Sequence, residues 1–217
     1  GLAAAPMRLQ GADVVAVGGG RAVADGALAV IGPGTGLGVS GLVADGRGGW
    51  RVIVGEGGHV TLAATNAREA SLLAVLRERW GHVSAERVLS GNGLVNLYQA
   101  ICALDGAEPR ALKPAEVTAA ANDGSDPQCV AALAQFTAFL GNVAGNLALT
   151  LGARGGMYLG GGIVPRFGTA FDATLFRRHF EAKGRFGDYL QSIPTWIIVA
   201  PAPALLGASR ALDLMPT

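Results

Sequence analysis

The sequence has little charge and few aromatic residues, and these shortages exclude several classes of partner. Only 15% of the 217 residues are charged, and 17 basic side chains against 16 acidic ones give a formal net charge of +1. A surface for nucleic acid or an anionic membrane needs concentrated basic charge, which this composition does not provide. Half of the residues are hydrophobic, which is enough to bury a core. We expect a folded protein whose partner is a small molecule.

Cysteine is equally scarce. The two cysteines, Cys102 and Cys129, are isolated and form no CxxC pair. They suit buried packing positions in a reducing compartment better than a disulfide framework or a zinc site. The start of the chain shows no signal peptide, so we expect a cytoplasmic protein. The chain also lacks a Met at position 1, which raises the possibility that it is a fragment.

One segment is apolar enough to raise the question of a membrane helix. No charged residue occurs from position 127 to 153, and Gly141 and Gly145 form a GxxxG pattern. Four polar residues nevertheless fall on one helical face, and the segment has neither an aromatic belt nor a basic flank. We therefore predict a buried helix of a soluble protein, with the glycines admitting a closely packed neighbour. The polar residues are Gln128, Gln135, Asn142 and Asn146.

The 34 glycines are well above the usual share of about 7% and indicate many tight turns. Between the turns, hydrophobic runs follow the order three strands, several helices, strand and helix, strand and helix. This order predicts an α/β fold with a mixed sheet flanked by helices. The expected strands are 27–32, 37–45, 50–54, 156–160 and 193–200. The expected helices are 68–80, one marked by Leu94 to Leu104, one from Pro114, one from Pro127, one from Pro165, 172–183 and 202–212.

Residues 1–26 are rich in Ala and Gly and show no clear periodicity. We expect them to form a loosely specified lead-in rather than regular structure. No repeat, linker or low-complexity tract divides the rest. The chain is therefore expected to form a single domain over 1–217.

The first candidate site is the stretch GPGTGLG at 32–38, between two predicted strands. A backbone without Cβ atoms can present several N–H groups to a phosphate, and Thr35 adds a hydroxyl donor. No GK[ST] follows, so this is not a P-loop. The GxGxxG frame that begins at Gly36 is followed by a strand pattern, where a dinucleotide fingerprint needs a helix. A plain glycine-rich hairpin is the alternative.

The second candidate site is GEGGH at 55–59, which ends the third predicted strand. Because only two glycines separate Glu56 from His59, a carboxylate and an imidazole can converge on one polyhydroxyl ligand. Solvated surface groups in a loop are the alternative.

The third candidate is the stretch 81–87, where Ser84 is a predicted helix N-cap. Glu86 then lies in the first helical turn, where the helix dipole favours a negative charge. This structural role explains Glu86 without a ligand, and His82 is also interpreted as structural.

The fourth candidate is the glycine cluster at 160–162, between a predicted strand and a predicted helix. Glycines at such a junction let a flat ring or a sugar–phosphate group lie against the backbone and the helix N-terminus. A tight strand-to-helix turn is the alternative. Given the earlier glycine loop, we favour contact with a nucleotide.

At these stretches the sequence resembles the bacterial glucokinase family of the actin-like ATPase and sugar kinase superfamily. The resemblance runs from about Ala27 to the C-terminus, and its long blocks are specific. It implies a ribonuclease-H-like (actin-like ATPase) large domain. The blocks are IGPGTGLGV (31–39), GEGGHV (55–60), GHVSAERVLSGNGLVNLY (81–98), GNLAL (145–149), GGGIVPRF (160–167) and KGRF (183–186).

The resemblance implies a hexose kinase that uses ATP and Mg²⁺ to phosphorylate the 6-hydroxyl of glucose, the first step of glycolysis, and suggests a homodimer. It implies that the second phosphate loop includes Gly34, Thr35 and Gly36. The glucose hydroxyls would be held by Glu56, His59 and Glu86, which changes our interpretation of Glu86 from a dipole charge to a ligand residue. The adenosine would be bordered by Gly160, Gly161 and Gly162. The CxCGxxGC cluster of a related group is missing, so we expect no structural zinc.

The small lobe of this family carries a first phosphate loop, DxGGTNxR, and an Asn-Asp pair whose Asp is the base for the sugar hydroxyl. We expect neither motif in this chain, and GLAAAP at its start resembles the stretch just after that Asp. We therefore interpret the chain as the large lobe and expect the base upstream of Gly1. Residues 1–217 alone are predicted to turn over weakly or not at all.

Two alternatives stay open. The chain could belong to a kinase for another hexose or an amino sugar, since the same acids and histidine would recognise shared hydroxyls. It could also be a sugar- or nucleotide-binding module without catalysis. A panel of substrates tests whether another hexose is preferred. The sequence upstream of Gly1 distinguishes an enzyme from a binding module without catalysis.

Overall fold

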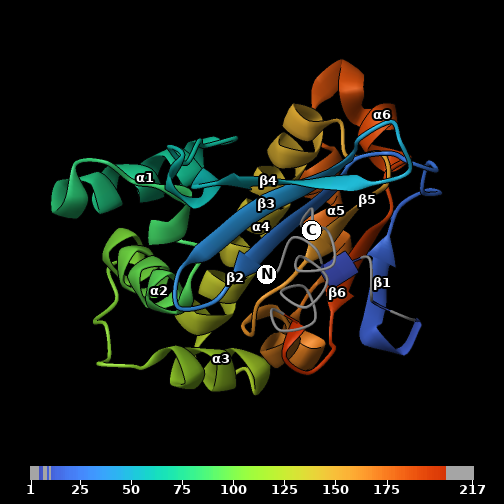
Figure 1. Cartoon of the computed structure of the whole chain (residues 1–217). Coiled ribbons are helices and arrows are strands. Elements are labelled where there is room, and N and C mark those ends of the chain that lie inside the picture. Colours follow the sequence, from blue (N-terminus) through green and yellow to red (C-terminus); the bar gives the residue numbers. More distant parts are fainter. Residues whose placement is uncertain (1–4, 7–8, 10, 204–217) are drawn as a thin grey trace.

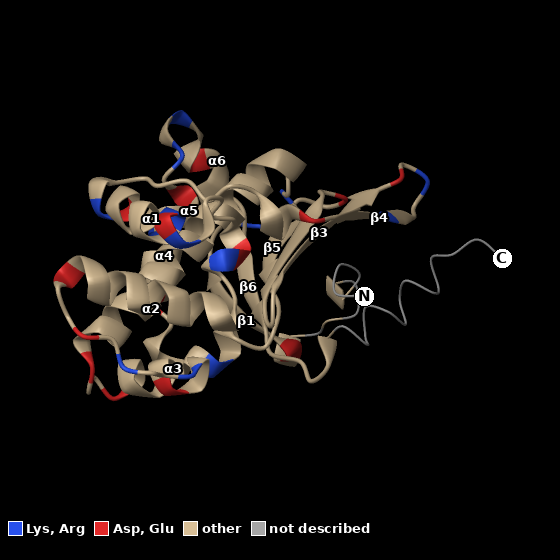
Figure 2. Cartoon of the chain, turned by 90° about the vertical axis from the view of Figure 1, so that its left-hand side faces the viewer, with Lys and Arg blue, Asp and Glu red and all other residues tan. Residues whose placement is uncertain are grey.

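The computed structural model describes residues 5–6, 9 and 11–203 (Figure 1). Six strands in these residues form one mixed sheet, in the order β1-β6-β5-β2-β3-β4. The labelled helices lie on one side of this sheet in the view of Figure 2. The predicted α/β fold is therefore confirmed. The strands are β1 (Val14–Gly18), β2 (Leu28–Pro33), β3 (Leu37–Ala44), β4 (Trp50–Gly55), β5 (Gly156–Leu159) and β6 (Thr195–Ile198).

The centre of the sheet is β2, which is antiparallel to β3 on one side and parallel to β5 on the other. Strand β4 continues the antiparallel meander beyond β3, and β6 runs parallel to β5. Residues 29–33 of β2 are all buried, because this strand has a neighbour on each side and helices pack against it. Since β2, β5 and β6 run in the same direction, their carboxyl ends lie at one edge of the sheet.

Strand β1 corrects the prediction that residues 1–26 form an unstructured lead-in. Within that range Val14–Gly18 pairs antiparallel with β6, with Val14 opposite Ile198. The signal was missed because the partner strand lies about 180 positions away in the sequence, so no local turn or hairpin announces the pairing. The predicted closing helix over 202–212 lies almost entirely outside the described residues.

The helices begin where the sequence places capping residues. Asn66, Ser90, Asp126 and Asp172 each accept a backbone N–H of the first turn that follows. The predicted helix at Pro165 is a 3₁₀ segment rather than an α-helix. The α-helices are α1 (Ala67–Trp80), α2 (Gly91–Asp105), α3 (Pro114–Asn122), α4 (Pro127–Leu151), α5 (Ala173–Glu181) and α6 (Gly187–Gln191). The 3₁₀ segments are η2 (Gly11–Asp13), η3 (Gly57–His59), η4 (Ala85–Arg87), η5 (Val164–Ala170) and η6 (Gly184–Phe186).

Helix α4 is the core helix of the domain. It is the one helix in the described residues that is long and apolar enough to cross a bilayer, but 67% of its most apolar window is buried inside the protein. A Cβ at Gly141 or Gly145 would overlap the carbonyl oxygens of Phe176 and Phe180 on α5. The predicted close neighbour is therefore α5. One of the polar residues on α4 makes a hydrogen bond within the protein, since Gln135 Nε2 donates to Glu69 Oε1 over 3.1 Å.

Candidate functional site

Two glycine bends lie at the carboxyl ends of two parallel strands. Strand β2 runs into the turn Gly34–Gly36, and β5 runs into the cluster Gly160–Gly162. A backbone hydrogen bond of 2.8 Å from Gly160 N to Ile31 O joins the two strand ends. Open α/β sheets bind their ligands outside the carboxyl ends of the parallel strands. The two predicted phosphate and nucleotide segments therefore occupy the edge where a ligand is expected.

The Gly34–Gly36 turn abuts the start of helix α2. Gly34 N donates to Gly36 O over 2.8 Å, and Gly91 N at the first position of α2 donates to Gly34 O over 2.9 Å. Thr35 at the tip is exposed. The turn and the positive end of the α2 dipole thus adjoin, an arrangement that favours an anionic group near Thr35.

The carboxylate of Glu86 reaches across from η4 and packs on this turn. Leu37 N donates to Glu86 Oε2 over 2.9 Å. A Cβ on Gly36 would lie 2.5 Å from the same oxygen, so the absence of a side chain at Gly36 makes room for the carboxylate. Ser84 Oγ accepts the Arg87 N–H, which confirms the predicted N-cap. The Glu86 side chain itself leaves the cap region and contacts the β2–β3 turn.

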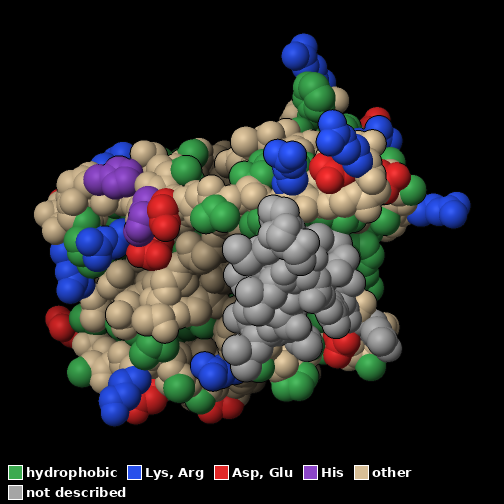
Figure 3. Space-filling model, in the orientation of Figure 1, with side chains coloured by type: hydrophobic (Ala, Val, Ile, Leu, Met, Phe, Trp, Pro, Cys, Tyr) green, Lys and Arg blue, Asp and Glu red, His purple; other side chains and the backbone are tan. Residues whose placement is uncertain are grey.

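His59 lies beside the Glu86 carboxylate in the folded chain. Its Nδ1 lies 3.9 Å from Glu86 Oε1, and 59% of the His59 side chain is exposed. Figure 3 shows a histidine directly beside acidic side chains on this face of the molecule. Segment η3 is seated against β3 because Gly58 has no Cβ to overlap Leu37 O. A hydrogen bond of 2.9 Å from Ala85 N to Val60 O ties η4 to the residues that follow η3.

Glu56 lies at the start of η3, and its backbone carbonyl accepts the His59 N–H over 3.0 Å. The Glu56 carboxylate is exposed and makes no hydrogen bond or ion pair within the described part of the chain. Two of the three predicted sugar residues, His59 and Glu86, are thus brought together directly, and Glu56 is one turn away in the chain. His82, interpreted as structural, lies on the surface with Nε2 3.1 Å from Thr61 Oγ1.

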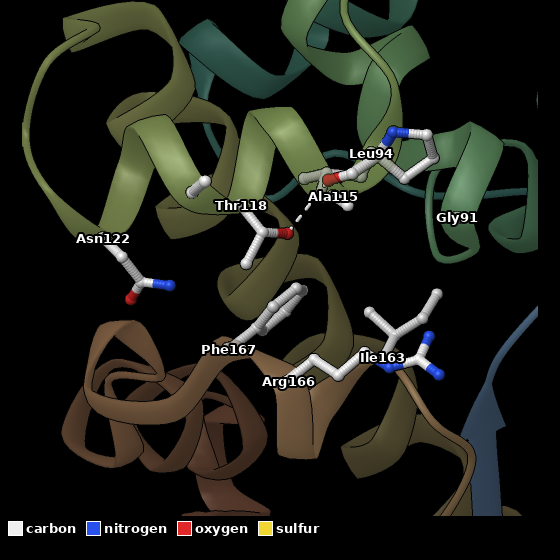
Figure 4. A pocket seen from close by; sticks show the side chains of 10 residues that line it. Gly91, Leu94, Ala115, Thr118, Asn122, Ile163, Arg166 and Phe167 are labelled. Carbon is white, nitrogen blue, oxygen red and sulfur yellow. Dashed lines mark hydrogen bonds between the residues drawn. The ribbon is translucent and has the colours of Figure 1, made fainter.

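A cavity of about 310 Å³ opens between α2, α3 and η5 (Figure 4). Its walls are mostly apolar, and Figure 4 shows Thr118 and Asn122 along α3, with Phe167 and Arg166 on the opposite side. No sequence pattern predicted this cavity beyond the helices themselves, because its walls come from separate segments of the chain. The lining residues are Gly91, Leu94, Pro114, Ala115, Thr118, Ala119, Asn122, Ile163, Arg166 and Phe167.

The glycine cluster at 160–162 leads into this cavity without lining it. Gly161 has a φ of +77°, and a Cβ there would overlap Pro33 O, so this position is explained by the packing of two strand ends. Gly162 is exposed and lies beside Arg166, and the next residue, Ile163, lines the cavity.

The chain contains one Asn-Asp dipeptide, Asn122-Asp123, which corrects the expectation that no such pair occurs. It ends α3, where the Asp123 carboxylate accepts the Ser125 N–H over 2.9 Å. Hydrogen bonds from Ser125 lower the pKa of Asp123, which suits a helix-end acceptor rather than a base. The dipeptide therefore has a structural setting, while Asn122 faces the cavity.

A family model of glucokinases matches residues 1–215. The chain belongs to the glucokinase family. A curated glucokinase from Aromatoleum aromaticum is 57% identical over 95% of this chain, which spans 62% of that relative's length. The chain thus corresponds to about three fifths of a full-length glucokinase of this kind.

Solved structures agree with the family. The crystal structure of a glucokinase from an Antarctic psychrotroph superimposes with a TM-score of 0.93 at 37% identity, covering 99% of this chain and 66% of that one. A glucokinase from Balamuthia mandrillaris in complex with glucose has a TM-score of 0.81 at 22% identity, covering 97% and 60%. The actin-like ATPase fold expected from the family resemblance is confirmed.

Proposed function

We propose that this chain is the large lobe of a glucokinase that transfers the γ-phosphate of ATP to the 6-hydroxyl of glucose, the first step of glycolysis. The family membership supports the reaction, and the names of the relatives support the sugar. The observation that carries the proposal is the contact of the Glu86 carboxylate with the Gly34–Gly36 turn. This contact places a residue proposed to bind the sugar against a loop proposed to bind phosphate.

The acceptor sugar is proposed to lie beside His59 and Glu86. Glu86 Oε2 is engaged by the Leu37 N–H, whereas Oε1 faces the imidazole 3.9 Å away. A sugar hydroxyl between these groups can donate to Oε1 and bond to a ring nitrogen of His59. The exposed carboxylate of Glu56 is available to accept from a second hydroxyl. The backbone bond to Leu37 fixes the direction of the Glu86 side chain and so orients the acceptor.

The nucleotide is proposed to lie with its base in the α2–α3–η5 cavity. The apolar walls suit a flat ring, and the Asn122 amide at one end can both donate and accept at the edge of a base. Gly91 at the other end adjoins Gly34, so the phosphates would run from the cavity toward the Gly34–Gly36 turn. Gly160, Gly161 and Gly162 are then the backbone that borders the adenosine.

In the described residues no three His, Cys, Asp or Glu side chains gather in a way that could hold a metal ion. Mg²⁺ is proposed to be bound through the nucleotide phosphates, as is usual for this ion in kinases. It would neutralise charge on the transferred phosphoryl group. The 6-hydroxyl oxygen bonds to the γ-phosphorus, the bond to ADP breaks, and the hydroxyl proton passes to a base expected upstream of Gly1.

Binding of glucose to residues 1–217 tests the acceptor site without turnover. We expect isothermal titration to detect glucose binding that Glu86→Gln weakens at least about tenfold, through loss of a charged hydrogen bond. Glu78→Gln on α1 is the matched control and should bind like the parent. Equal affinity in the parent and E86Q would overturn the sugar site. A panel with mannose, fructose and glucosamine tests whether another hexose is preferred.

Turnover is a separate measurement. A coupled assay for glucose 6-phosphate is expected to show weak or no activity for residues 1–217, and rates typical of a complete enzyme would refute a missing base. A homodimer stays a prediction from the family resemblance, and sedimentation of the protein checks it. A cytoplasmic location stays a prediction from the sequence.

A further inference from the structure

A second hollow lies on the other side of Pro114 from the nucleotide cavity. Its volume is about 460 Å³, and its walls come from α1, η4, α2 and the segment before α3. Pro114 lines both spaces, while neighbouring residues of α2 face different ones: Gly91 lines the cavity and Asn92 lines the hollow. The hollow is therefore distinct from the candidate site described above, although the two share a wall.

Three cations line this hollow, and no carboxylate does. They are Arg79, Arg87 and Lys113. None of the three side chains forms an ion pair with any residue that the structure describes. Glu78 lines only an adjoining groove, and the Glu116 carboxylate is bound to the Lys113 backbone N–H. In a chain with a formal net charge of +1, this is a local excess of positive charge.

The side chains of Arg79 and Arg87 are exposed, but neighbouring residues hold their guanidinium groups in place. Arg79 lies 4.5 Å and Arg87 5.4 Å from the centre of the Trp80 ring. Arg79 Nη1 also donates to Gln99 Oε1 over 3.1 Å. Stacking on an aromatic ring leaves the edge donors of a guanidinium open to a phosphate, and it reduces the entropy lost on binding.

We propose that this hollow is a second binding site, which takes a small polyhydroxylated phosphomonoester. The phosphate would be held by Arg79, Arg87 and Lys113. The hollow also presents the Asn92 amide, and it presents Asn96 Oδ1 and Gln99 Nε2, whose partner atoms bond to Arg87 O and Arg79. These groups can bond to hydroxyl groups of a ligand. Because of these amides, we expect the site to favour a hydroxyl-bearing ester over a bare anion. The site does not depend on the proposed sugar phosphorylation.

Tryptophan fluorescence of residues 1–217 tests the site, because Trp80 stacks on both arginines. Titration with glycerol 3-phosphate at constant ionic strength is expected to give a saturable change that Trp80→Phe abolishes. Arg87→Gln and Lys113→Gln should each weaken binding at least tenfold. Arg47→Gln, in the exposed β3–β4 turn, is the matched control and should bind like the parent.

Two further titrations test whether the ester binds in the hollow and whether its hydroxyl groups contribute to binding. Saturating ADP should leave the glycerol 3-phosphate titration unchanged, and displacement by ADP would assign the signal to the nucleotide site instead. Inorganic phosphate should bind at least threefold more weakly than the ester, and equal binding would overturn the role of the amides. A lack of any saturable signal in the folded parent would overturn the proposal, whatever glucose and ATP do.

Discussion

The two glycine bends at the carboxyl ends of β2 and β5 differ in what occupies the space of the missing side chain. At Gly161 the space is filled by the backbone carbonyl of Pro33, and the φ of +77° is itself unfavourable for other residues. At Gly36 it is filled by the carboxylate of Glu86, the end of a flexible side chain. One glycine thus serves the fold, whereas the other makes room for a functional group.

The same contrast holds for two carboxylates. Asp126 is buried and accepts the N–H groups of Gln128 and Cys129, and it pairs with Arg110 at 2.6 Å. Its hydrogen-bonding capacity is used within the protein. Glu86 accepts one backbone N–H, and its other oxygen faces His59 at an exposed surface. A carboxylate with an oxygen left over is the better candidate for a ligand residue.

The largest effect is expected at Gly161. Gly161→Ala adds a Cβ that overlaps Pro33 O and forces a positive φ on alanine, so we expect a loss of about 3 kcal/mol in the free energy of unfolding. Urea unfolding followed by circular dichroism measures it. Gly162→Ala, one residue on and with no close neighbour to overlap, should change stability by less than about 0.5 kcal/mol. Similar losses of stability in both variants would show that the overlap with Pro33 O does not determine the effect at Gly161.

Local chemistry in the sequence was enough to predict most of the elements. Asp126 followed by Pro127 begins α4, and Gly141 and Gly145 receive α5, as their residue types imply. What local patterns could not supply was pairing over long separations. Strand β1 was missed for that reason, and so were the cavity walls around Asn122 and Arg166. Leu104, predicted on the apolar face of α2, is 36% exposed and lies next to the last residue of that helix.

The contact between Glu86 and the β2–β3 turn is another long-range contact that local patterns could not predict. From the sequence, Ser84 and Glu86 were correctly placed in a capped first turn, and that role alone seemed sufficient. The structure adds that the carboxylate joins the backbone of Leu37, 49 positions earlier. No periodicity or motif spacing encodes such a contact, and the family resemblance pointed to Glu86 only as a residue that binds the sugar.

Asp126 should give an intermediate effect that depends on pH. Burial raises its pKa, but the Cys129 N–H, Arg110 and the Gln128 N–H together outweigh this and hold the pKa below the ordinary 3.8. Because the folded-state pKa is depressed, the stabilisation is present above about pH 4 and is lost as the pH falls through the folded-state value. We expect Asp126→Ala to cost about 1–2 kcal/mol at pH 7, with a smaller difference from the parent at pH 3.

Asp126→Asn separates the two contributions, because asparagine is an equally good N-cap but carries no charge. Its stability at pH 7 should lie between those of the parent and D126A. The difference between D126N and D126A should stay nearly constant with pH. Urea unfolding from pH 3 to 7 measures all three proteins, and a D126N curve that keeps the full acid dependence of the parent would assign that dependence to other groups.

The smallest effect on stability, and the most selective one on binding, is expected at Gly36. Gly36→Ala places a Cβ 2.5 Å from Glu86 Oε2, so the carboxylate must move while the backbone can stay. Glucose affinity should fall about tenfold, equivalent to about 1.4 kcal/mol, while the free energy of unfolding changes by less than about 1 kcal/mol. In Gly34→Ala the nearest atom to the new Cβ is 4.0 Å away, so glucose binding should be preserved. If the two variants bind glucose alike, the space at Gly36 serves only the turn, and the distinction between a structural and a functional glycine fails at this site.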